Sequence, residues 1–69
     1  MNQFTPHNTR KGEKFVTATG ITGTVSECYF CPYRRTDMVL ITYTLGARVG
    51  NPSKVVTHWT PTSEVKRLA

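Results

Sequence analysis

The sequence predicts an all-β protein, a small five-stranded antiparallel barrel with one short helical turn before its last strand. From Gly12 onward, short runs of β-branched and aromatic residues alternate with Gly, Pro, Asn or Asp, as in strands separated by turns. No segment longer than about six residues has apolar positions at helical spacing. At 69 residues the chain has room for one core, so five short strands must curl to bury an apolar face.

The five predicted strands are short and end at turn-forming residues. The third, MVLITY, is the most apolar run and is predicted to be the central strand. Gly20 and Gly23 reverse the chain between the first two strands, because glycine allows positive φ and close backbone approach. The strands cover residues 13–18 (EKFVTA), 24–28 (TVSEC), 38–43 (MVLITY), 54–59 (KVVTHW) and 65–68 (VKRL).

The connecting segments follow from their turn residues. Residues 29–37 are predicted to form a long exposed loop, because Pro32 lacks the N–H that a central strand needs. Residues 45–53, with two glycines and an Asn-Pro pair, are predicted to turn. Pro61 restricts the next segment to a tight turn, in which Thr60 or Thr62 caps a single helical turn.

The domain is predicted to span residues 11–69, preceded by a flexible arm at residues 1–10. The arm is polar and has neither strand alternation nor helical period. An alternative is that Phe4 folds back over one end of the core. Which parity of residues 38–43 faces inward stays open, because both sides are apolar. The predicted core comprises Phe15 or Val16, with Val25, Val39, Ile41, Val56 and Leu68.

The charge is strongly positive. Nine Lys and Arg against four Asp and Glu give a formal net charge of +5 and a pI near 9.7. A field of that sign attracts polyanions or acidic protein surfaces, although a basic balance is also common in small soluble proteins. No stretch approaches the ~18 apolar residues of a membrane span, and no signal-type segment is present, so we expect a cytoplasmic protein without membrane contact.

The first two strands and the last resemble those of a known family. They resemble the KOW motif, the opening of SH3-like barrels in transcription elongation factors and ribosomal proteins. The resemblance implies an SH3-like barrel that binds RNA polymerase, the ribosome or their nucleic acid. It is carried by Lys11, Gly12, Glu13, Lys14, Phe15 and Val16, then by Gly20, Ile21, Thr22, Gly23, Thr24 and Val25, and at the end by Trp59, Pro61, Glu64, Val65, Lys66, Arg67 and Leu68.

Two cysteines, Cys28 and Cys31, form a CxxC. On a turn this spacing can hold zinc, but only His7 and His58 remain as nitrogen ligands, and neither has paired spacing. A redox role needs a helix after the second cysteine, and Pro32 opens a loop sequence instead. We therefore expect two reduced cysteines and no cofactor, while zinc shared with a histidine stays open.

The predicted partner-binding surface combines aromatic and basic side chains. In residues 29–37 aromatic rings can stack on bases while guanidinium groups pair with phosphates or carboxylates; the alternative is that at least one ring packs into the core. Basic clusters also stand at the first and last strands, which closure of the barrel would bring together into one patch; edge lysines that prevent aggregation explain these clusters nearly as well. The candidates are Tyr29, Phe30, Tyr33, Arg34 and Arg35, with Arg10, Lys11, Lys14, Lys66 and Arg67.

No catalytic set is visible, because the four acids are scattered and neither a Ser/His/Asp nor a phosphate-binding glycine pattern appears. We therefore expect a monomeric, non-catalytic regulatory module of gene expression with no small-molecule substrate. It would dock on RNA polymerase, the ribosome or nucleic acid. The competing hypothesis is a small phage-type protein that inhibits one acidic host protein without nucleic-acid contact.

Overall fold

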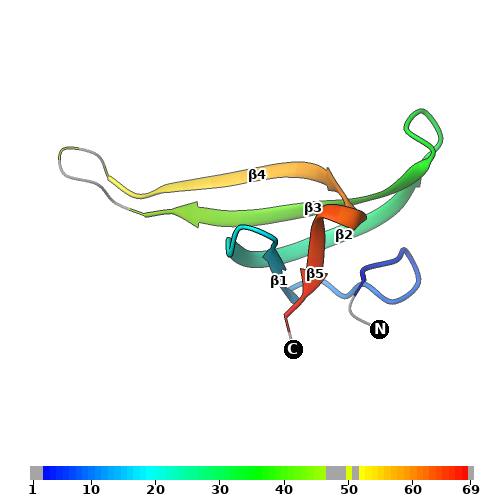
Figure 1. The fold of residues 1–69 in the computed structure, drawn as a ribbon, viewed down its shortest axis with the longest axis horizontal. Coiled ribbons are helices and arrows are strands. Elements are labelled where there is room, and N and C mark those ends of the chain that lie inside the picture. Colours follow the sequence, from blue (N-terminus) through cyan, green and yellow to red (C-terminus); the bar gives the residue numbers. More distant parts are fainter. Residues whose placement is uncertain (1–2, 47–49, 51, 69) are drawn as a thin grey trace.

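The computed structural model describes residues 3–46, 50 and 52–68, which form an all-β fold (Figure 1). One five-stranded antiparallel sheet and a single 3-10 turn before the last strand confirm the predicted class. In this part of the chain no helix is long and apolar enough to cross a membrane. The elements are β1 (Lys14–Thr17), β2 (Thr22–Cys31), β3 (Thr36–Leu45), β4 (Lys54–Pro61), η1 (Thr62–Glu64) and β5 (Val65–Arg67).

The sheet is open, so the predicted closure into a barrel was wrong. Its strand order is β4-β3-β2-β1-β5, which leaves β4 and β5 as the two edges. The cause is strand length: β2 and β3 have ten residues each, whereas β1 has four and β5 three. Figure 1 shows β2, β3 and β4 as a long ribbon that extends well past the short β1–β5 pair.

The core lies where the short pair meets this ribbon. Four of the predicted core residues, Phe15, Val25, Val39 and Ile41, are buried there. Val39 and Ile41 share one side of β3, which settles the parity that the sequence left open. Two predictions at the ends were inaccurate: Val56 is only half-buried, and Leu68 is 43% exposed because it follows the last residue of β5.

The prediction of a long loop at residues 29–37 was wrong, because most of this segment belongs to the β2–β3 hairpin. Strand pairing continues to Cys31 opposite Thr36, and only residues 32–35 form the turn. Pro32 lies in the turn itself, so its missing N–H interrupts no ladder. Arg35 takes a positive φ of 53° to complete the reversal. Leu45, the first residue of the turn predicted at residues 45–53, belongs to β3. Positions 47–49 and 51 of that prediction lie outside the described residues.

The 3-10 turn forms without the predicted threonine cap. Pro61 occupies the cap position, with extended φ and ψ and no side-chain hydrogen bond. The Thr60 hydroxyl instead donates a hydrogen bond of 2.9 Å to Oε2 of Glu64, the last residue of the turn. Thr60 and Thr62 are both buried, which gives them a packing role.

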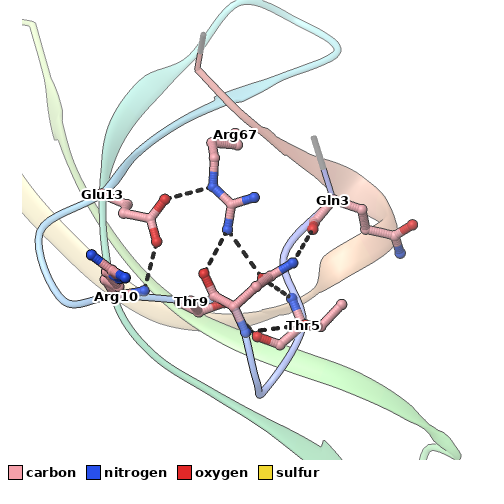
Figure 2. A network of polar contacts seen from close by, with 7 residues as sticks. Gln3, Thr5, Thr9, Arg10, Glu13 and Arg67 are labelled. Atoms are coloured by element: carbon pink, nitrogen blue, oxygen red, sulfur yellow. Dashed lines mark hydrogen bonds and ion pairs between the residues drawn. The ribbon is translucent and has the colours of Figure 1, made fainter. Parts of the chain in front are cut away.

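Residues 3–10 fold against the core, with Phe4 as their anchor. The Phe4 side chain is fully buried, the alternative that the sequence left open. The Arg67 guanidinium lies 4.7 Å from the Phe4 ring centroid, and its Nη2 donates to the Asn8 backbone oxygen at 3.0 Å. Arg67 Nε also pairs with Glu13 Oε2 at 2.5 Å (Figure 2). Arg67 therefore links the last strand to the N-terminal segment.

This link makes stability depend on pH. The hydrogen bond from Arg67, followed by that from the Arg10 backbone N–H, holds the pKa of Glu13 below its ordinary value of 4.5. A depressed carboxyl pKa stabilises the fold above the unfolded-state pKa, and this stabilisation is lost as pH falls through the folded-state pKa. We expect Glu13→Gln to lower the urea midpoint at pH 7. The difference from wild type should shrink as pH falls below 4.5 and vanish once pH lies below the folded-state pKa of Glu13. A difference that is unchanged at acid pH would contradict this assignment.

Candidate functional site

The sheet has two sides of different character. The inner side carries Phe15, Val25, Val39 and Ile41, which are buried in the core. We call the opposite side the outer face; by register it includes Tyr29, Met38, Leu40 and Trp59, with Thr24, Thr42 and Thr57 beside them. Several of these side chains are exposed, so the outer face is open to solvent in the described part of the chain.

An aromatic pair stands on the outer face. Tyr29 on β2 and Trp59 on β4 meet across β3, with ring centroids 4.8 Å apart and an interplanar angle of 88°. Their register partners on β3 are Met38 and Leu40, so the pair lies over these two residues and Met38 is only 5% exposed. The rings themselves remain 45% and 39% exposed. They are therefore accessible to a partner.

Trp59 was not among the predicted site residues. A sequence signal for it existed: Val56 was predicted to face inward, and a period of two then places Trp59 outward. The pairing with Tyr29 could not be foreseen, because the predicted loop at residues 29–37 removed Tyr29 from the sheet. Extending β2 to Cys31 brings the two rings together.

The predicted aromatic cluster is divided among three places. Tyr29 lies on the outer face, whereas Phe30 is on the inner side opposite Asp37 and is 55% exposed. Tyr33 stands in the turn and is 96% exposed. None of the three is buried in the core, and they do not form one surface.

The predicted basic residues gather at two places, the β2–β3 turn and the β1–β5 pair. Arg34 and Arg35 are exposed in the turn, and among the described residues neither forms an ion pair. Because β1 pairs with β5, Lys14 of the first predicted cluster, which also holds Arg10 and Lys11, lies beside the strand that carries Lys66 and Arg67. Their roles differ. Lys14 and Lys66 are exposed on one side of the β1–β5 pair, whereas Arg67 is engaged with Glu13, Asn8 and Phe4.

A cleft of about 770 Å³ opens on the inner side, between the β1–β2 turn, β3–β4 and the η1–β5 segment. Residues 18, 19 and 21 of the β1–β2 connection form part of its wall. In its wall Tyr43 Oη and His58 Nε2 are 3.3 Å apart. The apolar lining includes Ile21, Ile41 and Val65.

The two cysteines face opposite sides of β2. Cys28 pairs with Val39 on the inner side and Cys31 with Thr36 on the outer face, since positions three apart on a strand point in opposite directions. They cannot ligate one ion together in this arrangement. Among the described residues no three His, Cys, Asp or Glu side chains lie close enough to hold a metal. Burial raises the pKa of the Cys28 thiol, which disfavours its reactive thiolate.

Comparison of the chain with protein-family models, curated proteins and solved structures found no match.

Proposed function

We propose that the protein is a non-catalytic regulatory module of gene expression that acts in the cytoplasm by docking on nucleic acid, or on the RNA polymerase or ribosome that handles it. The observation that carries this proposal is the distribution of charge. Nine Lys and Arg face four Asp and Glu, and one acid, Glu13, is paired with Arg67. Exposed cations remain in the β2–β3 turn and on the β1–β5 pair, so the protein presents a positive surface to a polyanion.

The resemblance to KOW-type SH3-like domains adds support. It rests on a strand, a glycine-paired turn and a second strand, followed much later by a one-turn helix and a last strand. Here β1 and β2 flank the turn that holds Gly20, Gly23 lies near the start of β2, and η1 precedes β5. The last strand returns to pair with β1. These shared elements favour the gene-expression partners that the resemblance implies.

The competing function is that of a small phage-type protein that binds and inhibits a single acidic host protein. The inner cleft favours it, because an apolar hollow of about 770 Å³ suits side chains of a protein partner better than a phosphate backbone.

A pull-down from bacterial lysate, with and without nuclease, separates the two functions. Capture of RNA polymerase, ribosomes or nucleic acid supports the first proposal. Capture of one acidic protein unrelated to gene expression, unaffected by nuclease, overturns it. For a nucleic-acid partner we expect affinity to fall steeply with salt, because each neutralised phosphate releases a counterion.

The same binding assay tests the turn arginines. Substituting Arg34 and Arg35 together by Ala should weaken binding by about 2 kcal/mol or more, because guanidinium groups on a projecting turn can pair bidentately with phosphate or carboxylate. The comparison variant is Lys14→Ala with Lys66→Ala, which removes equal charge from β1–β5 and leaves the Arg67 contacts intact; it should weaken binding less, because a lysine ammonium group cannot pair bidentately. Equal losses from the two double variants would contradict a specific turn contact and indicate diffuse attraction by charge.

A further inference from the structure

We propose that the Tyr29–Trp59 pair on the outer face is a stacking platform for the bases of single-stranded nucleic acid. This inference rests on the proposed function, because it presumes that nucleic acid is a direct partner. It adds that the nucleic acid is single-stranded and that the aromatic pair is the surface that contacts it. The pair could simply shield Met38, which lies beneath it. Shielding accounts for the buried sides of the rings, but not for the 45% and 39% of their surface that stays open.

The setting of the rings offers polar and basic groups to a nucleic-acid strand. Glu27 is the one carboxylate that register places on the outer face in the described strands, and its β3 partner is Leu40. Beyond the rings, hydroxyl groups follow: Thr42 Oγ1 and Thr57 Oγ1 are 3.1 Å apart and can bond to bases or sugars. Lys14, the partner of Thr24 on β2, continues this row toward β1.

Cations therefore flank the aromatic pair. Arg34 and Arg35 stand in the turn that closes the β2–β3 hairpin, close along β2 to Tyr29, while Lys14 and Lys66 lie at the β1–β5 end. A strand laid along the outer face can place phosphates on these cations and bases on the rings. Paired bases are stacked on one another inside a duplex and do not present their faces to an exposed aromatic ring, so the platform selects single strands.

The protein contains a single tryptophan, Trp59, which makes the platform its own fluorescent probe. We expect an oligodeoxythymidylate or polyuridylate strand to quench Trp59 fluorescence on titration at low salt. A duplex of equal length should bind at least about 5-fold more weakly, because its bases are unavailable for stacking. Inorganic polyphosphate at equal phosphate concentration should leave the fluorescence unchanged, since it has charge but no bases.

Two variants of β2 give a matched comparison. Tyr29→Leu should reduce affinity for the single strand at least about 5-fold, the lower limit of one lost base–ring contact. Phe30→Leu likewise removes one aromatic ring at the neighbouring position, on the other side of the strand, and should change affinity less than 2-fold. Because Trp59→Leu removes the fluorescent tryptophan, the affinity of this variant is measured with a fluorescently labelled strand. Circular dichroism identifies any variant that fails to fold, and quenching of the wild-type protein then decides the outcome.

The results distinguish this inference from the function on which it rests. Binding of single strands without quenching, or equal losses from Tyr29→Leu and Phe30→Leu, overturns the stacking platform and leaves the proposed function standing. Equal binding of duplex and single strand likewise overturns the platform alone. If neither a nucleic acid nor a gene-expression protein binds in the lysate and titration experiments, both fail.

Discussion

Replacing Gly23 with Ala should destabilise the protein by about 3 kcal/mol or more, a large part of the stability expected for so small a core. A β-carbon at this position would collide with the backbone oxygen of Thr42 and lie 2.8 Å from Phe15 Cε1 and 2.9 Å from Tyr43 Cβ. The oxygen belongs to β3, the central strand of the long ribbon, and cannot move without disturbing the strand pairing. Urea denaturation followed by circular dichroism measures the loss.

Two other glycines provide graded controls. Gly20 has a φ of +89° and open space around it, so Gly20→Ala should cost about 1 kcal/mol from backbone strain alone. Gly46 has neither a positive φ nor a neighbour within 4 Å, so Gly46→Ala should leave stability unchanged or slightly raised. A Gly23→Ala protein as stable as the Gly46→Ala protein would show that β2 and β3 do not approach as closely as described.

The glycine pair also shows how far the sequence could predict the fold. It located the turn and proposed two physical reasons for glycine there, positive φ and close approach. The structure assigns them separately, positive φ to Gly20 and close approach to Gly23. The sequence could not make this division, because close approach depends on a contact with β3, which lies far along the chain.

The length of the strands was the main failure of the sequence analysis. Pro32 was interpreted as the mark of a long loop, whereas it stands in a short turn between two ten-residue strands. A proline shows that its own position is outside a ladder and gives no information on how far pairing extends on either side. The closed barrel depended on short strands of similar length, and Tyr29 and Phe30 were placed in a loop for the same reason.

The sequence analysis named candidate residues that are largely exposed, but it missed Trp59 and could not predict how the candidates are arranged. The predicted aromatic and basic side chains are exposed in large part, as a binding surface requires. The strand register, however, places Tyr29 and Phe30 on opposite sides of β2 and brings Tyr29 next to Trp59. Arg67 is held by contacts within the fold. A shift of one residue reverses the face of every side chain, so faces follow only when strand boundaries and the bulge between Val25 and Glu27 are known.

A second large loss of stability is expected from a change in the N-terminal segment. The sequence predicted this segment to be a flexible arm, with the alternative that Phe4 folds back over one end of the core. In the structure Phe4 is fully buried and belongs to the same core cluster as Phe15 and Val65. The ring also lies under the Arg67 guanidinium, so its loss would remove this contact as well as apolar burial. Phe4 therefore completes the end of the core that the open sheet leaves uncovered.

Phe4→Ala should destabilise the protein by about 3 to 5 kcal/mol, the usual range for deleting a buried phenylalanine ring. Because the total stability expected at this size is only a few kcal/mol, much of the variant should be unfolded at 25 °C, as measured by circular dichroism and urea denaturation. Phe30→Ala is the matched control; it removes a ring that is 55% exposed and should cost less than about 1 kcal/mol. Phe4→Leu, which retains most of the apolar volume, should recover over half of the loss. If Phe4→Ala is instead as stable as Phe30→Ala, residues 3–10 contribute nothing to the core in solution, and the flexible arm expected from the sequence is the correct description.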